Sequence, residues 1–290
     1  MKVFSKITET TAFIQKQKNS GLTIGFVPTM GALHEGHISL MRQAKSENDL
    51  LVASIFVNPI QFNNKSDLEK YPITFESDSL MLEEVGCDIL FAPSAAEMYP
   101  EPIIKNYDFG LLGDVMEGAN RPGHFNGVAI VVKKLFEICL PTKSYFGEKD
   151  FQQLAIINKL VKIENLDIEI IPCPIVRESD GLAMSSRNAR LSNEQRQIAP
   201  FIHKTLLQAR NLAGNKSVNE VKTWVENEFN SNKAFRLEYF EISDDTDLQQ
   251  VSDWNDAKNT MGFVVANMGN VRLIDNIRLF NNFALSKEGY

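Results

Sequence analysis

Two histidines three residues apart follow a short apolar segment, within residues 28–37. Residues 23–27 are expected to form a buried strand and residues 35–44 a helix. A helix start exposes unpaired backbone N–H groups and the positive end of the helix dipole, which together form an anion site. His34 and His37 should share one side of this helix. Their imidazoles could then donate hydrogen bonds to a phosphate oxygen as charge develops on it.

Other roles for this pair remain open. Histidines at this spacing could bind zinc, although a catalytic zinc site normally has a third protein ligand and no cysteine or carboxylate cluster lies nearby in the sequence. Glu35 lies between them and should point away from their shared face. The pair could also be purely structural. Gly31 and Gly36 would let the backbone approach a phosphate closely, but no Gly-Lys-Ser/Thr follows, so the segment is not a Walker loop.

A second polar segment, residues 181–188, reads Gly-Leu-Ala-Met-Ser-Ser-Arg-Asn. Arg187 can bind a polyphosphate through two parallel hydrogen bonds, and Ser185 and Ser186 can add neutral donors. A solvated linker between two domains is the alternative interpretation.

A third candidate, residues 147–150, lies between an expected short strand and an expected helix. Lys149 is a movable positive charge suited to phosphate. Asp150 could simply be the N-cap of the helix. Gln152 and Gln153 follow on its first turn, where their amides could bind a polar substrate.

Gln61 and Arg121 are two further candidates for binding a ligand. Gln61 leaves the end of residues 50–57, a nearly continuous apolar segment typical of a central parallel strand. Its amide offers both a donor and an acceptor. Arg121 is a candidate anion ligand, whereas His124 is more readily interpreted as a satisfied surface histidine.

The elements that must position these residues alternate between strand and helix as far as residue 176. This pattern predicts an α/β domain with a Rossmann-like, doubly wound parallel sheet. Ligands of such sheets bind at the carboxyl ends of the strands, and four of the five candidate segments fall at a strand end or a helix start. The expected helices are residues 75–85, 126–140 and 151–163, the further expected strands are 88–92, 143–146 and 168–171, and residues 61–74 are expected to be a polar loop.

The pattern changes after residue 177. Helices are expected over residues 192–212 and 217–230, each opened by a serine with capping-box spacing. Strands are expected over 237–242, 261–266 and 271–274, the last two joined by a hairpin turn at Gly269. The sequence therefore predicts a first domain over residues 1–176 and a smaller C-terminal α+β domain over residues 177–290.

Composition restricts the class of protein. The 290 residues are 43% apolar and carry a net charge of −7, which suits a globular protein and disfavours nucleic acid as a partner. Cys87, Cys139 and Cys173 lie in apolar stretches without a CxxC pair, and we expect buried, reduced thiols in a cytoplasmic protein. No signal-peptide core and no run of about 18 apolar residues is present, so no membrane association is expected.

The motifs together resemble a known family. His-Glu-Gly-His at residues 34–37 resembles the HIGH motif of the nucleotidyltransferase superfamily, and Met-Ser-Ser-Arg at residues 184–187 resembles its KMSKS counterpart. Class I aminoacyl-tRNA synthetases share both features, but they fit the net charge poorly and carry a tRNA-binding extension. With residues 27–33, 56–62, 121–125, 146–153 and 272–276, the chain resembles the pantothenate synthetase family over nearly its whole length.

This resemblance implies an AMP-forming ligase that joins pantoate to β-alanine through an acyl-adenylate, as a cytoplasmic, Mg²⁺-dependent homodimer with the second domain as a lid. It implies that His37 is a catalytic acid, with His34, Lys149 and Arg187 also on the phosphates. Asp150 would contact the ribose, and Gln61, Gln153 and Arg121 the acid substrates. The implied ATP-binding residues are Met30, Gly31, Ala32, Leu33, His34, Glu35, Gly36, His37, Gly147, Glu148, Lys149, Asp150, Val176, Met184, Ser185, Ser186 and Arg187.

One departure from the family pattern is visible, since Ile73 stands where the family usually has arginine in Tyr-Pro-Arg-Thr. Nearby Asp78 could be a Mg²⁺ ligand or a surface carboxylate. Two other functions stay open: an adenylyltransferase of the same superfamily that acts on a phosphorylated acceptor, and a zinc-dependent or ligand-sensing binding module.

Overall fold

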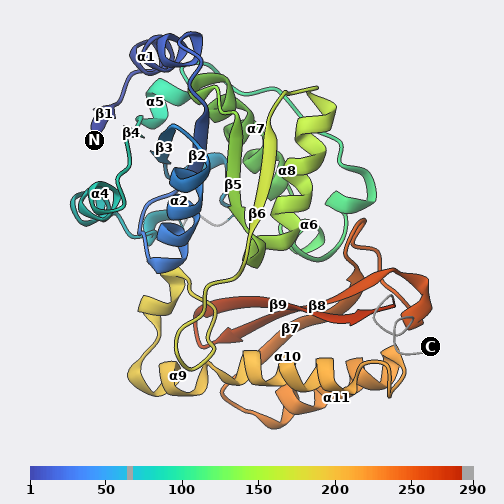
Figure 1. Cartoon of the computed structure of the whole chain (residues 1–290). Coiled ribbons are helices and arrows are strands. Elements are labelled where there is room, and N and C mark those ends of the chain that lie inside the picture. Colours follow the sequence, from blue (N-terminus) through green and yellow to red (C-terminus); the bar gives the residue numbers. More distant parts are fainter. Residues whose placement is uncertain (64–67, 283–290) are drawn as a thin grey trace. The chain divides into compact units, whose positions relative to one another are not determined.

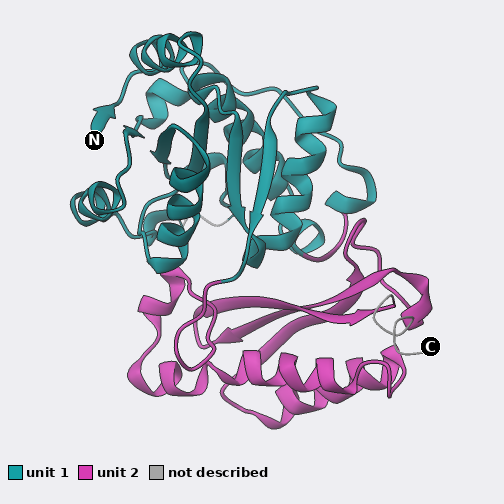
Figure 2. Ribbon diagram, in the orientation of Figure 1, with its two compact units in different colours: residues 1–113, 117–175 teal, residues 114–116, 176–290 magenta. Residues whose placement is uncertain are grey.

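Figure 1 shows the computed structural model of the chain, which describes residues 1–63 and 68–282. Contacts divide the chain into two compact units (Figure 2). Unit 1 comprises residues 1–113 and 117–175, and unit 2 comprises residues 114–116 and 176–290. Within the described part of the chain, no helix has the length and apolar character needed to cross a membrane.

Unit 1 is built on a parallel sheet, which confirms the predicted fold class. The described residues form six strands in the order β1-β4-β3-β2-β5-β6, all paired in parallel. The strand predicted to be central, β3, lies inside the sheet between β4 and β2. The strands are β1 (Lys2–Phe4), β2 (Ile24–Thr29), β3 (Leu50–Ile55), β4 (Ile89–Phe91), β5 (Lys143–Gly147) and β6 (Glu169–Cys173).

Helices cover both faces of this sheet because neighbouring strand residues point to opposite sides. Phe26 of β2 packs edge-on against Phe136, with ring centroids 6.3 Å apart. Its neighbour Val27 belongs to a core cluster with Ile38 and Met41. The helices are α1 (Ile7–Asn19), α2 (Glu35–Glu47), α4 (Phe75–Glu84), α5 (Ala95–Met98), α6 (Met116–Asn120), α7 (His124–Cys139) and α8 (Phe151–Ile163), with 3-10 turns η1 (Pro59–Gln61), η2 (Gly110–Gly113) and η3 (Glu148–Asp150).

Unit 2 holds an antiparallel sheet in the order β7-β8-β9, packed on α10 and α11 around its own apolar core. The predicted hairpin is present: Met268 pairs with Val271, and Gly269 takes the left-handed conformation in the turn between them. The elements are η4 (Ser186–Arg190), α9 (Asn193–Ile198), α10 (Phe201–Leu212), α11 (Val218–Ser231), β7 (Arg236–Asp244), η5 (Trp254–Asp256), β8 (Asn259–Met268) and β9 (Val271–Asn281).

Some sequence predictions differ from the structure. The helix expected over residues 192–212 is wrong as a single element, because α9 ends at Ile198 and α10 begins at Phe201. Pro200 separates them: it has no N–H to donate, so the hydrogen-bond ladder cannot continue through it. Strand β9 extends well past the predicted residue 274, and β1 and α1 were not predicted. Of the predicted polar loop, residues 64–67 lie outside the described residues.

Candidate active site

The loop from β2 to α2 has an unusual backbone. Gly31 and Ala32 both have positive φ, +81° and +51°. Thr29 begins the turn, because its hydroxyl accepts from the backbone N–H of Gly31 at 3.1 Å and donates to the carbonyl of Ser54 at 2.7 Å. The loop therefore leaves the carboxyl end of a central strand in a fixed conformation that favours glycine at its first position.

The carboxylate of Asp78 holds this loop from helix α4. Its Oδ2 accepts the backbone N–H of Ala32 and its Oδ1 that of Leu33, each at 2.9 Å. The hydroxyl of Thr74 donates to Oδ2 at 3.0 Å. Asp78 is only 2% exposed, so the interpretation as a surface carboxylate is wrong. With both oxygens occupied by protein donors, the geometry favours a structural anchor over a metal ligand.

His34 and His37 cap the start of α2 reciprocally. Nδ1 of His34 accepts the backbone N–H of Gly36 at 3.1 Å, and Nδ1 of His37 accepts the backbone N–H of His34 at 3.3 Å. The ring centroids are 4.1 Å apart. With both Nδ1 atoms accepting, each neutral ring carries its proton on Nε2, where it can be donated to a ligand.

The pKa of His37 is lowered to about 3, first by burial and then by the nearby charges of His34 and Lys149. His37 is therefore neutral at physiological pH. Among the described residues, no group of three His, Cys, Asp or Glu side chains could hold a metal ion. This arrangement suits hydrogen-bond donation to an anion better than zinc binding.

Gln61 connects a second candidate segment to this loop. Its side chain is 8% exposed, and its Nε2 lies 3.2 Å from Sδ of Met30. Its Oε1 accepts from Nδ2 of Asn58 at 3.0 Å, and Asn58 also donates to the carbonyl of Gly127. Sequence reasoning singled out Gln61 and not Asn58 from this segment, although the place of Asn58 shortly after the end of β3 and directly before Pro59 is a signal that could have found it.

Helix α7 approaches Gln61 from the other side. A Cβ on Gly127 would lie 2.6 Å from the carbonyl oxygen of Ile60, so only glycine permits this contact. His124 is 7% exposed and fully engaged: Nδ1 lies 2.9 Å from the carbonyl of Gln61 and Nε2 lies 3.0 Å from Nη1 of Arg121. Both ring nitrogens of His124 have hydrogen-bond partners, as expected, but the residue is buried and not on the surface as the sequence suggested. Arg121 is thereby held close to the Gln61 backbone.

The residues between β5 and α8 include the third predicted segment. Lys149 is close enough to His37 to help lower its pKa. Asp150 occupies the N-cap position of α8, yet its side chain makes no capping hydrogen bond and is 51% exposed. Gln152 is committed to the protein, since it accepts from the N–H of Glu117 and donates to the carbonyl of Leu112.

The side chain of Gln153, unlike that of Gln152, is not held by hydrogen bonds to other protein groups of the described residues. Gln153 is half-buried, and its amide has no hydrogen-bond partner within residues 1–63 and 68–282. Of the two glutamines, Gln153 is therefore the one with an amide available to a ligand. Gly147 and Glu148, which precede Lys149 in the predicted ATP segment, are half-buried as well.

The remaining predicted residues lie in unit 2. The backbone N–H of Met184 donates to the carbonyl of Val176 at 3.0 Å, which brings two of these residues together. The hydroxyl of Ser185 accepts the N–H of Arg187 at the start of η4. Just before this segment, Arg177 forms a bidentate ion pair with Asp275 of β9, at 2.7 and 2.9 Å.

Within unit 1, direct contacts therefore join the loop before α2 to η1 through Met30 and Gln61, and η1 to the start of α7. Lys149 adds positive charge near His37. Together these groups offer neutral and cationic donors for a polyphosphate and amides for a small polar substrate.

Comparisons with known proteins agree with this chemistry. The family model described as "Pantoate-beta-alanine ligase" matches residues 2–278. A pantothenate synthetase from Porphyromonas gingivalis is 49% identical over 278 residues, which cover 96% of this chain and 99% of the relative. The crystal structure of pantothenate synthetase from Thermus thermophilus matches with a TM-score of 0.90 and 41% identity, covering 97% of this chain and all of the other.

A further crystal structure comes from Francisella tularensis. It is described as pantoate-beta-alanine ligase complexed with beta-gamma ATP and beta-alanine. It matches with a TM-score of 0.79 and 36% identity, covering 96% of this chain and 97% of the other.

Proposed function

This chain belongs to the pantoate–β-alanine ligase family and catalyses the ATP-dependent condensation of pantoate with β-alanine, and from that premise we propose which residues carry the reaction. The observation that carries the proposal is the 3.2 Å contact between Gln61 Nε2 and Met30 Sδ. It joins the amide that would bind pantoate to the loop that would bind ATP. Membership of this family decides against an adenylyltransferase with a phosphorylated acceptor and against a binding module.

The ATP site of unit 1 is built from the residues around the two histidines. The Nε2 protons of His34 and His37 and the positive end of the α2 dipole hold the phosphates, because the backbone N–H groups of His34 and Gly36 are already taken up by the two histidine rings. Lys149 adds a positive charge, and the exposed carboxylate of Asp150 binds the ribose hydroxyls. The unit 1 residues assigned to ATP are Met30, Gly31, Ala32, Leu33, His34, Glu35, Gly36, His37, Gly147, Glu148, Lys149 and Asp150.

Pantoate lies against Gln61 and Gln153, with Gln61 also reaching β-alanine. The amide of Gln61 is already oriented by Asn58, and that of Gln153 has no other partner within residues 1–63 and 68–282. Arg121, held beside Gln61 by His124, supplies positive charge for the carboxylates of the substrates.

The reaction proceeds in two displacements. The carboxylate of pantoate attacks the α-phosphorus of ATP and pyrophosphate leaves, which forms pantoyl adenylate. The amine of β-alanine then attacks the acyl carbon, AMP leaves, and the amine loses a proton as the amide forms. His37 acts as a neutral donor to the phosphoryl oxygens rather than as a charged acid, because its pKa is about 3 before ATP binds.

Mg²⁺ was expected from the family resemblance, and the donor set tests that expectation. The described residues contain no cluster of three potential ligands, and the oxygens of Asp78 already accept from Ala32, Leu33 and Thr74. The residues therefore do not fit a protein-built Mg²⁺ site around Asp78. We propose that the ion enters with the phosphates of ATP, which is how Mg²⁺ is commonly bound in nucleotide sites.

The roles of the unit 2 residues are those that the family resemblance implies. Val176 contacts the adenine, while Met184, Ser185, Ser186 and Arg187 bind the polyphosphate. The second unit acts as a lid that shields the mixed anhydride from water. The backbone hydrogen bond from Met184 to Val176 supports a common role for these residues.

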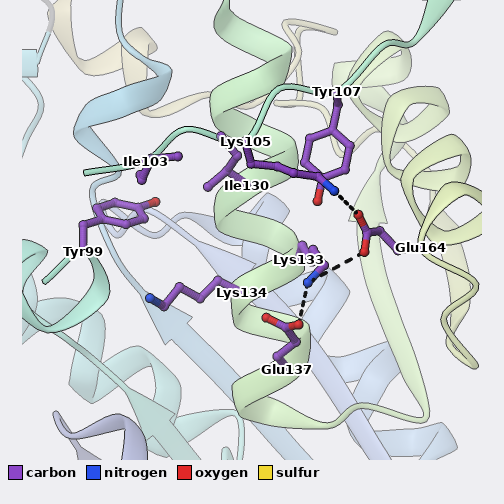
Figure 3. A pocket seen from close by; sticks show the side chains of 9 residues that line it. All are labelled: Tyr99, Ile103, Lys105, Tyr107, Ile130, Lys133, Lys134, Glu137 and Glu164. Atoms are coloured by element: carbon purple, nitrogen blue, oxygen red, sulfur yellow. Dashed lines mark hydrogen bonds and ion pairs between the residues drawn. The ribbon is translucent and has the colours of Figure 1, made fainter. Parts of the chain in front are cut away.

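A homodimer in the cytoplasm completes the proposal. Ile103 is 36% exposed and lines a cavity of about 300 Å³ in unit 1 (Figure 3), and the next residue in the sequence, Ile104, is 96% exposed. We propose that these two isoleucines contribute to a contact with a second copy of the chain. Replacing Ile104 with lysine should shift the mass in solution toward the monomer. Three buried, unpaired cysteines suit a reducing compartment.

The test of the reaction is product release from the purified protein with ATP and Mg²⁺. Pantoate alone should release pyrophosphate at a level near the enzyme concentration, and β-alanine should produce sustained AMP release. Absence of pantoate-dependent pyrophosphate would contradict the adenylate mechanism.

A further inference from the structure

Tyr99 lies outside every motif discussed above, yet it contacts the site residues. It follows α5, and its ring packs edge-on against Phe56, with centroids 6.0 Å apart. One side of the ring lines the cavity shown in Figure 3. Its hydroxyl donates to Oδ1 of Asn58 at 2.8 Å. Burial raises the pKa of Tyr99, so this hydroxyl remains a donor throughout the working pH range.

The amide of Asn58 has only one orientation that satisfies its surroundings. Asn58 is 1% exposed, and its nitrogen lies 3.1 Å from the carbonyl oxygen of Gly127, which can only accept. The NH₂ group must therefore face Gly127 and the oxygen must face Tyr99. The same NH₂ group lies 3.0 Å from the side chain of Gln61, so the Gln61 atom facing it must be the oxygen Oε1.

The side-chain hydrogen bonds of Tyr99, Asn58 and Gln61 therefore form a series in which every donor points toward the candidate site. Tyr99 donates to Asn58, Asn58 donates to Gln61, and the NH₂ group of Gln61 is left facing Met30 in the candidate site. Pantoate presents acceptors there, in its carboxylate and hydroxyl oxygens. If Gln61 were flipped, it would turn a carbonyl oxygen toward the carboxylate, and the two would repel.

We propose that Tyr99 is a positioning residue for pantoate: acting through Asn58, it holds Gln61 with its NH₂ group toward the substrate. The inference rests on the proposed role of Gln61 in pantoate binding. The hydroxyl of Tyr99 donates to Asn58, so its effect on Gln61 is indirect and depends on that single hydroxyl.

The variant Tyr99→Phe tests this, because it keeps the ring and its packing and removes only the hydroxyl. Loss of one hydrogen bond in a buried chain should raise the KM for pantoate about tenfold. The KM for ATP should stay within twofold of the wild-type value. A purely structural tyrosine would lower thermal stability and change both KM values together.

Tyr107→Phe is the matched control. Tyr107 lines the same cavity, but its hydroxyl bonds to Glu164 rather than to Asn58 or Gln61. This variant should leave the KM for pantoate unchanged. If Tyr99→Phe leaves the KM for pantoate within twofold, or if Tyr107→Phe raises it equally, the proposal is overturned.

Gln61→Ala separates failure of this inference from failure of its premise. If Gln61→Ala does not raise the KM for pantoate, the assigned role of Gln61 is wrong. If it does, the double variant decides: adding Tyr99→Phe to Gln61→Ala should have no further effect on that KM, since the residue being positioned is gone. An undiminished further rise would show that Tyr99 acts by another route and would overturn the proposal.

Discussion

The backbone N–H of His34 donates to Nδ1 of His37 at the start of α2, over 3.3 Å. This bond fixes the tautomer of His37, because an Nδ1 that accepts must leave the ring proton on Nε2. The pKa of about 3 keeps the ring neutral. The sequence motif thus serves two purposes in our proposal, since the side chain of His37 caps the helix and presents its Nε2 proton to the proposed phosphate site.

Replacing His37 with alanine should lower kcat about 10²–10³-fold, the usual effect of removing one donor to developing charge. The fold should survive, because only one capping bond is lost. The variant His37→Gln retains an N–H donor, so its kcat should lie between those of the wild type and of His37→Ala. Sustained AMP release with saturating ATP, pantoate and β-alanine measures the effect on kcat, with circular dichroism to compare folds. Wild-type turnover in the alanine variant would remove His37 from the mechanism.

His124 should make the protein less stable in mild acid. Burial and the neighbouring Arg121 lower its pKa to about 4, while an unfolded histidine titrates near 6.5. Between these values the unfolded chain binds a proton that the native protein does not, so stability falls as pH falls. The contribution of this one group is at most about 1.4 kcal/mol per pH unit.

The variant His124→Asn removes the titration while keeping an N–H donor for the carbonyl of Gln61. Denaturant unfolding at several pH values from 4 to 7 should show a shallower dependence of the unfolding free energy on pH than in the wild type. Equal slopes in the two proteins would mean that His124 titrates normally in the native state.

Asp78→Asn should weaken ATP binding by loosening the loop before α2. The new amide offers one acceptor in place of two, and its NH₂ group would face a backbone N–H of Ala32 or Leu33. A buried donor left unpaired costs about 1–3 kcal/mol, so we expect a lower melting temperature and a KM for ATP raised about tenfold.

Glu76→Gln is the control for this variant, because Glu76 lies on the same first turn of α4 but is exposed. It should change neither the melting temperature nor the KM for ATP. An Asp78→Asn protein that binds ATP normally but has lost a Mg²⁺ requirement or affinity would instead favour the metal role first assigned to Asp78.

Local signals explain why much of the fold could be predicted. Ser192 and Ser217 each form a capping box with the residue three positions later, and Gly269 supplies the left-handed turn of a two-residue hairpin. In each case the interacting groups are within four residues of one another. The alternation of apolar strands with amphipathic helices likewise predicts a parallel sheet, and no knowledge of distant contacts is needed to see it.

The anchoring residues could not be found in this way. Asp78 reaches Ala32 across 46 positions, and Tyr99 reaches Asn58 across 41. No local pattern distinguishes Asp78 from exposed Glu76 on the same helical turn, because the difference is created only when α4 packs beside the loop. The sequence therefore points to the groups that we propose meet ATP and pantoate more readily than to the groups that hold them in place.

Gly147→Ala should separate ligand contact from protein packing. Gly147 has a φ of −73° and a ψ of 133°, which alanine adopts without strain, and a Cβ there would have no protein atom within 4 Å. The melting temperature should therefore stay the same or rise slightly. If the nucleotide approaches this backbone as proposed, the methyl group would occupy the space that the nucleotide needs, and the KM for ATP should rise several-fold. An unchanged KM for ATP, measured with saturating pantoate and β-alanine, would place the nucleotide away from Gly147 and remove this residue from the proposed ATP site.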